Sequence, residues 1–540
     1  MRFAVVDYII VAAYLLVTLA IGFWSAWRTR HASSRGFFVA EKTLPWWVVG
    51  FTMVAASISA EQMLGEVGYG FGAGLVVSNW DLAVYPSLLL MIFVFLPLYL
   101  RSGITTIPEY LERRYGRTTR LLFAAYTVLN NAGITLAMVL ALGATAMKYF
   151  LGMDPVWAAA ALAVFTGLYT VWGGMSSVAW TDTFQCVLLL AGGLVLFFIG
   201  MQHVDGGLGG LLERMPDAHL LRGVHDPYVP WPGLILLALS TNVWYCCTNQ
   251  FYVQSCLGAK SQWHGRMGVL LTAFLGPVLT LCFAFPGYIA ADLVRTGKLP
   301  AIEDANSTYP LLVKTFLGPG LRGFLVAAVL AAIMSTVSSV VNATASVFTI
   351  DIYQRWLRPG SDERRLKGVG RLTGMATLLV AFPLSLLALR YSYIFTYSQN
   401  SWCILAIPIM LVFTLGALWK RATGQAAVAT MLAVLPFVIV PFVFGSTSDN
   451  YLDLPRIGRV HLFNFAFVLW LAAAAFMVFV SLLTRQPAVF PATGHRVSDY
   501  VWSPGVSRSP RDQEPAWYRR ISLWAAVAGV IYLSLYVAYR

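Results

Sequence analysis

The sequence predicts an all-α polytopic membrane protein. Hydrophobic residues make up 58% of the 540 residues, charged residues make up only 11%, and the mean hydropathy is +0.70. A soluble protein of this length carries about a quarter charged residues. Apolar runs of about 20 residues, long enough to cross a bilayer as helices, recur about 14 times along the chain.

These apolar runs give the order of the expected spans. They lie at 5–27, 45–65, 80–100, 120–148, 155–174, 182–202, 231–254, 267–293, 310–350, 370–389, 392–418, 424–445, 460–484 and 521–539. The first run is long enough to span and lacks the small-residue cleavage site of a signal peptide, so we expect it to be retained. No soluble domain interrupts the series, which argues against a fused kinase, nuclease or hydrolase.

Lys and Arg are distributed unevenly between the alternating loops. One set of loops holds 25 of the 37 basic residues, at 28–42, 101–120, 260–266, 355–371, 420–421 and 485–520. The positive-inside rule makes this set cytoplasmic and places both termini outside. The same bias explains the net charge of +13 without a nucleic-acid partner. We expect the plasma membrane, specifically a bacterial inner membrane, because no eukaryotic feature is obvious.

Residue types that carry enzymatic chemistry do not converge in this sequence. The six cysteines lie in or beside apolar runs without metal-ligand spacing, so we expect packing residues. The seven histidines fall in loops or at span ends, and neither a His-x-x-Glu-His motif nor a nucleophile elbow is present. A phosphate-cradling glycine loop is also lacking. We therefore expect a transporter that is not an enzyme and has no cofactor. A passive channel or a nutrient sensor is the alternative class of function.

Hydroxyl side chains cluster within one long apolar stretch, residues 327–353. Isolated hydroxyls in a buried helix mean little, since they bond to carbonyls of their own helix. Ser335 and Thr336, followed by Ser338 and Ser339, instead gather oxygen on neighbouring faces of one turn. Such a cluster is costly at mid-membrane unless a cation or polar group uses it. We interpret it as a sodium site.

Small and polar residues interrupt two further spans. Span 45–65 contains the stretch Ala55–Gln62, which four glycines follow, and span 231–254 contains Ser240–Asn242. Interruptions at corresponding places five spans apart are typical of unwound helices in inverted-repeat transporters. Close helix packing by small residues is the alternative for either stretch taken alone.

Several separate motifs resemble the signature of the sodium:solute symporter family. They are Gly167–Tyr169, Trp172–Ser176 and Ala179–Asp182, with further landmarks at Ser335–Tyr353 and Trp419–Arg421. The resemblance covers spans one to twelve and is strongest to the sodium/glucose and sodium/galactose cotransporters. It implies a leucine-transporter-type fold with two inverted five-helix repeats, formed by spans 2–6 and 7–11.

This fold divides the chain into four parts. They are a first span and cytoplasmic loop at 1–44, a first repeat at 45–202, a second repeat at 231–418, and peripheral helices at 419–540 with a basic cytoplasmic linker near 485–520. The resemblance implies that no oligomer is required and that the partners are sodium, a small solute and the bilayer.

The resemblance also implies the ion sites. The family's sodium site matches Ala55, Ile58, Ala332, Ser335 and Thr336. Carbonyl and hydroxyl oxygens are the ligands that hard cations take, and an unwound helix frees carbonyls. A second sodium site of some relatives matches Asp182, Ser338 and Ser339, with Ser335 shared. For Asp182, a capping or salt-bridge role is the alternative.

The substrate site follows from the same resemblance. Its matching residues are Gln62, Asp81, Asn242, Gln399 and the inner gate Tyr245, and the outer gate matches Glu66, Trp80 and Phe395. A site of buried polar groups rejects analogues that leave those groups unpaired. For any single residue, an interhelical hydrogen bond is the alternative.

Four positions depart from the sodium/sugar pattern. Asp81 replaces a usual Glu, Gly276 replaces a Lys of a galactose-type relative, Cys246 replaces a common aromatic residue, and Glu66 replaces an apolar or small one. The sequence therefore predicts sodium-coupled symport of a small neutral solute, a hexose first, by alternating access. The alternative is another small solute: inositol or a polyol, an acidic sugar, a carboxylate or an amino acid.

Overall fold

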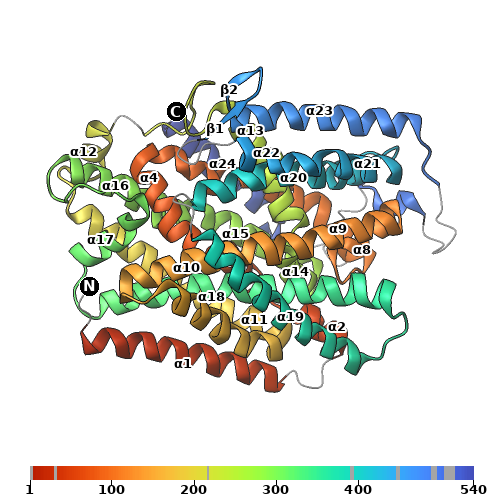
Figure 1. The fold of residues 1–540 in the computed structure, drawn as a ribbon, viewed down its shortest axis with the longest axis horizontal. Coiled ribbons are helices and arrows are strands. Elements are labelled where there is room, and N and C mark those ends of the chain that lie inside the picture. Colours follow the sequence, from red (N-terminus) through yellow and green to blue (C-terminus); the bar gives the residue numbers. More distant parts are fainter. Residues whose placement is uncertain are drawn as a thin grey trace.

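The computed structural model describes residues 4–28, 33–215, 218–389, 394–444, 450–487, 496–503 and 517–539. Within these ranges the regular structure is almost entirely helical, and the long helices lie roughly along one axis (Figure 1). Ten described helices are long and apolar enough to cross a membrane, and three shorter apolar helices accompany them. The chain is thus a multi-pass helical protein, and the count of 14 spans stays a prediction.

The first half of the chain forms a series of helices that ends at residue 202. They are α1 (Val5–Arg28), α2 (Ser34–Val39), η1 (Ala40–Lys42), α3 (Trp46–Ser57), η2 (Glu61–Glu66), α4 (Val67–Ala73), η3 (Gly74–Ser78), α5 (Asn79–Leu82), α6 (Tyr85–Leu90), η4 (Met91–Phe95), α7 (Leu96–Ser102), α8 (Ile107–Tyr115), α9 (Arg117–Asn130), η5 (Asn131–Thr135), α10 (Leu136–Leu151) and α11 (Pro155–Gln202). Two expected spans meet within α11 at Gly174, where a φ of 61° departs from helical geometry. Glycine adopts this conformation without steric cost.

The second half continues the helical series and adds one hairpin. Its elements are α12 (Gly207–Arg214), α13 (Trp231–Leu236), η6 (Leu237–Thr241), η7 (Trp244–Thr248), α14 (Gln250–Leu257), α15 (Gln262–Cys282), α16 (Ala284–Arg295), η8 (Ala305–Ser307), α17 (Thr308–Phe316), α18 (Leu321–Val347), η9 (Phe348–Leu357), α19 (Glu363–Ala388), α20 (Ile394–Leu418), α21 (Gly424–Val434), η10 (Leu435–Ile439), α22 (Val440–Phe444), β1 (Tyr451–Leu454), β2 (Gly458–His461), α23 (Leu462–Leu483), η11 (Val497–Tyr500), η13 (Trp517–Arg519) and α24 (Ile521–Ala538). Of the expected linker 485–520, residues 488–495 and 504–516 lie outside the described residues.

The strands β1 and β2 pair antiparallel, with Tyr451 opposite His461. The hairpin is an exception to the all-α prediction, because four-residue strands leave little alternation to detect in the sequence.

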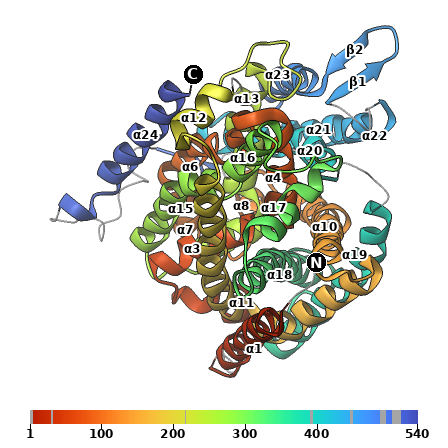
Figure 2. The same ribbon diagram turned by 90° about the vertical axis from the view of Figure 1, so that its left-hand side faces the viewer.

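Helix α18 lies in the interior of the bundle, and several other helices lie at its edge. In the most apolar window of the segment Leu321–Leu357, 94% of the residues are buried, compared with 22% in each of α1, α23 and α24. Figure 2 shows α18 inside the bundle and α1, α23 and α24 around it. The hydroxyl-rich helix therefore lies among protein side chains rather than lipid.

The beginning of α18 differs from the sequence prediction. The expected span 310–350 is divided into α17 and α18, because Gly320 adopts a φ of 85° after a Gly-Pro pair. The buried Asp7 of α1 accepts hydrogen bonds from the backbone N–H groups of Gly320 and Gly323 at 2.7 and 2.8 Å. Its carboxylate thus caps the start of α18.

One of the two predicted helix interruptions lies where the sequence places it. Helix α3 ends at Ser57 and Ile58 is extended (φ −102°, ψ 125°), which confirms the first. The second prediction is wrong in position. Ser240–Asn242 stays helical because a π turn at η6 accommodates these residues, and the extended residue is Asn249 (φ −78°, ψ 122°).

Candidate functional site

The break after α3 lies against the hydroxyl cluster of α18. Ser335 Oγ donates to the carbonyl of Ala55 at 2.9 Å and to that of Ala332 at 3.0 Å. Thr336 Oγ1 donates to the carbonyl of Ile58 at 2.9 Å and to that of Ala332 at 3.2 Å. All five residues are buried. The structure thus brings together three carbonyl and two hydroxyl oxygens, a set that suits a hard monovalent or divalent cation.

A second oxygen cluster lies one turn further along α18. Asp182 of α11 accepts from Ser338 Oγ at 3.2 Å and from Ser339 Oγ at 2.8 Å. Ser338 Oγ also donates to the carbonyl of Ser335 at 2.9 Å, which connects the two clusters. Asp182 is fully buried and lies in the interior of α11, away from the helix ends. It also takes part in none of the ion pairs of the described residues. This position does not support the capping or salt-bridge alternative.

A cavity of about 110 Å³ adjoins the helix break. By volume it holds several water molecules or a small solute. Every described residue of the expected substrate site lines it: Gln62, Asp81, Asn242, Tyr245 and Gln399. Glu66 and Trp80 line it too, so these outer-gate positions belong to the same space. The side chain of Phe395, the third outer-gate residue, lies outside the described part of α20.

Hydrogen bonds connect three cavity side chains in series. Trp80 Nε1 donates to Gln399 Oε1 at 2.9 Å, and Gln399 Nε2 donates to Glu61 Oε1 at 3.0 Å. On the same turn, Gln62 Oε1 accepts from the backbone N–H of Ser59 at 2.8 Å. The series joins α5, α20 and η2 across the cavity.

Several cavity residues, Glu61, Trp244 and Trp402 among them, were not among the sequence-based candidates. Glu61 precedes Gln62 in the interrupted stretch, so the polarity of that stretch was a signal for it. Trp244 and Trp402 also line the cavity, but a tryptophan in an apolar span gives no signal that separates a binding residue from a core residue.

The last helix, α24, covers the cavity wall at Gly276. A Cβ at this position would collide with the hydroxyl of Tyr532 and would lie 3.3 Å from the carbonyl oxygen of Asp81. The Tyr532 hydroxyl donates to the carbonyl of Ala273 at 2.8 Å. The space that a side chain at 276 would need is therefore filled by Tyr532.

Comparison with known proteins agrees with this geometry. The model of the sodium:solute symporter family matches residues 37–433. The chain belongs to this family. Sodium as coupling ion and a small-molecule solute follow from that membership. The family members and the structural relative below are transporters.

Individual relatives of this symporter transport sugars or inositol by name. This chain is 30% identical to a sodium/glucose cotransporter of Vibrio parahaemolyticus over 461 residues, and the match covers 80% of this chain and 84% of the relative. It is 30% identical to the sodium/mannose cotransporter of Bos taurus (98% and 95% covered) and to sodium/myo-inositol cotransporter 2 of Rattus norvegicus (89% and 77% covered).

A solved structure shares the fold of this symporter. It is the substrate-bound outward-open state of a Na⁺-coupled sialic acid symporter, with a TM-score of 0.77 at 21% identity, covering 90% of this chain and 99% of that one. At this identity the likeness establishes the fold alone.

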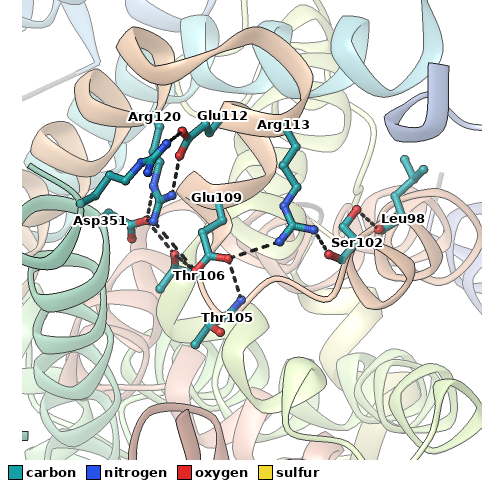
Figure 3. Close-up of polar contacts among 10 residues, drawn as sticks. Leu98, Ser102, Thr105, Thr106, Glu109, Glu112, Arg113, Arg120 and Asp351 are labelled. Carbon is teal, nitrogen blue, oxygen red and sulfur yellow. Dashed lines mark hydrogen bonds and ion pairs between the residues drawn. The ribbon is translucent and has the colours of Figure 1, made fainter. Parts of the chain in front are cut away.

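An ion-pair network ties α8, α9 and η9 together at one end of the bundle (Figure 3). Arg120 contacts Glu112 at 2.5 Å and Asp351 at 2.6 Å, and Arg355 also bonds to Glu112. Thr106 Oγ1 donates to Asp351 Oδ1 at 2.9 Å. Burial acts to raise the pKa of Glu112, but hydrogen bonds and charges from Arg120 and Arg355 hold that pKa below its ordinary value. The network holds the end of the helical segment that begins with α18.

Proposed function

We propose that this symporter takes up a small polyhydroxylated solute, a hexose first, by alternating access. One observation carries the proposal: Ile58 lines the cavity, and its carbonyl also accepts the hydroxyl of Thr336 in the oxygen cluster. An ion and a solute at these places would therefore contact the same break in the chain. The amides, carboxylates and aromatic faces around the cavity supply the partners that a sugar ring needs.

The coupling ion in this proposal binds at Ala55, Ile58, Ala332, Ser335 and Thr336. In this structure the hydroxyl groups donate to the carbonyl oxygens. A bound sodium ion would instead be coordinated by both kinds of oxygen, and would hold α18 against the broken helix. An ion couples to a solute when it binds one conformation better than the other. Sodium binding first would favour the outward-open state, and the solute would then drive closure behind Tyr245 and Trp80.

A second sodium at Asp182, Ser338 and Ser339, with Ser335 shared, belongs to the same proposal. One charge crossing 100 mV is worth about 2.3 kcal/mol, and a tenfold ion gradient adds about 1.4 kcal/mol. One sodium thus concentrates a neutral solute by roughly a few hundredfold and two by roughly 10⁵-fold.

The second candidate is inositol or another polyol, which the sodium/myo-inositol relatives favour. For either solute we propose two inverted five-helix repeats, which the shared fold of the sialic acid symporter supports. We also propose a bacterial inner membrane with both termini outside, and the charge distribution of the loops supports this orientation.

Uptake of labelled glucose, galactose and myo-inositol into proteoliposomes tests the proposal, with an inward sodium gradient compared with potassium. Ser335→Ala and Thr336→Ala should abolish the sodium dependence. Ser346→Ala is the matched control, because Ser346 is a buried hydroxyl of the same helix that bonds to the carbonyl of Asn342 in its own helix. Sodium-independent uptake of all three solutes would refute the proposal.

A further inference from the structure

The cavity is lined by three carboxyl groups, Glu61, Glu66 and Asp81, and the described part of its lining contains no Lys, Arg or His. Glu61 accepts a hydrogen bond from Gln399. Glu66 is 1% exposed, and its Oε1 has no hydrogen-bond partner among the described residues. The same holds for Oδ2 of Asp81. The cavity thus presents two carboxyl oxygens that have no hydrogen-bond donor in the part of the chain that the structure describes.

Glu66 and Asp81 lie against each other, from η2 and α5. Two carboxylates at such close range repel, and burial removes the water that would screen them. Neutralisation therefore has to come from a cation or from a proton. The basic residues of the described part of the chain form their ion pairs with other carboxylates, those of Glu109, Glu112, Asp205, Asp292 and Asp351.

The proposed sodium ions do not serve this pair, because their oxygens come from α18, from the end of α3 at Ala55 and Ile58, and from Asp182. A resident metal does not fit either: the described residues contain no group of three or more His, Cys, Asp or Glu placed to hold one. Nor does a lysine reach in from α15, since Gly276 has no side chain and Tyr532 fills the space beside it. A proton shared between Glu66 and Asp81 removes only one of the two charges. The remaining source of positive charge is the solute.

We propose that the transported solute carries a protonated amine that binds between Glu66 and Asp81. This inference rests on the proposed function and narrows it to an amino sugar or amino polyol. An ammonium group has three donors, enough for Oε1 of Glu66 and Oδ2 of Asp81 together. Asn242, whose Nδ2 is also unpaired, and Gln62 face the same cavity and suit the hydroxyls.

The aromatic lining agrees with a cationic solute. Trp80 and Tyr245 border the cavity, and aromatic faces attract ammonium groups within about 6 Å of the ring centroid. The acidic sugars and carboxylates among the alternative solutes fit badly, because they would bring a further negative charge to a cavity that holds three carboxyl groups.

Competition with the sodium-driven uptake of labelled glucose into proteoliposomes tests the inference. The three unlabelled competitors are glucosamine, N-acetylglucosamine and glucose. At slightly acidic pH, where the amine is protonated, we expect glucosamine to compete at least tenfold better than the other two. Glu66→Gln should remove this preference, so that the three probes compete to a similar extent. Glu303→Gln, a change of an exposed loop carboxylate, is the control and should behave as wild type.

Asp81→Asn is a second variant in case Glu66→Gln does not fold, and stabilisation of the detergent-purified protein against thermal unfolding by each probe reads binding directly. Equal or weaker competition by glucosamine, with the variants unchanged, would overturn the amine proposal. Sodium-dependent glucose uptake would then still support the proposed function. Absence of sodium-dependent uptake of every probe would overturn both.

Discussion

The hydroxyl of Tyr532 occupies the space that a side chain at Gly276 would need. The two residues lie on α24 and α15, and the Tyr532 ring also stacks on Tyr85 with centroids 4.6 Å apart. Figure 2 shows α24 at the edge of the bundle, yet its tyrosine reaches the cavity wall. The last helix therefore shapes a cavity that the sequence assigns to the core spans alone.

Gly276→Ala should destabilise the protein by about 1–3 kcal/mol, because the added methyl group meets Tyr532 in a packed interior. Thermal unfolding of the purified protein measures the effect. Tyr532→Phe removes the colliding oxygen, so the double variant should recover most of the lost stability. A double variant less stable than either single one would contradict the assigned contact.

Asp182→Asn should reduce the number of sodium ions per solute from two to one. The amide keeps the size of the side chain but removes the charge that faces Ser338 and Ser339. Steady-state accumulation of a neutral solute at 100 mV and a tenfold gradient should fall from roughly 10⁵-fold toward a few hundredfold. Parallel fluxes of labelled sodium and solute give the ratio directly, and an unchanged ratio would remove Asp182 from the ion site.

The sequence predicted one of the two helix breaks, and the roles of the ion and solute residues stay predictions. Ser335 and Thr336 stand out because clustered hydroxyls are costly in an apolar run, and the structure does bring them to the break at Ile58. The break at Asn249 was not found, since a π turn hides Ser240–Asn242 inside a helix. Such a turn leaves no periodic signal in the sequence.

Contacts between distant parts of the chain could not be predicted from the sequence either. Tyr532 and Gly276 are separated by most of the second half, and the apolar periodicity of α24 predicts only a lipid-facing span. The pairing of Glu66 with Asp81 likewise depends on how η2 packs beside α5, which no local pattern encodes.

Asp7→Ala should destabilise the protein by about 1–3 kcal/mol, because two backbone N–H groups at the start of α18 lose their acceptor. Asp7→Asn keeps an oxygen acceptor and should lose less. Thermal unfolding of both variants checks the order. Equal stability of wild type and Asp7→Ala would mean that water replaces the cap.

Glu112→Gln should lower stability at neutral pH by an amount that shrinks in acid. The pKa of Glu112 is held below its ordinary value of 4.5 against the effect of burial, because Arg120 and Arg355 bond to its carboxylate. A depressed folded-state pKa stabilises the protein above the unfolded-state pKa, and this contribution is lost as the pH falls through the folded-state value.

The unfolding temperatures of wild type and Glu112→Gln, measured from neutral pH to well below 4.5, should therefore converge at the acid end. Glu363→Gln, a change of an exposed carboxylate beyond the network, serves as the control. A difference between wild type and Glu112→Gln that stays constant over this range would show that the carboxylate contributes by packing and not by its charge.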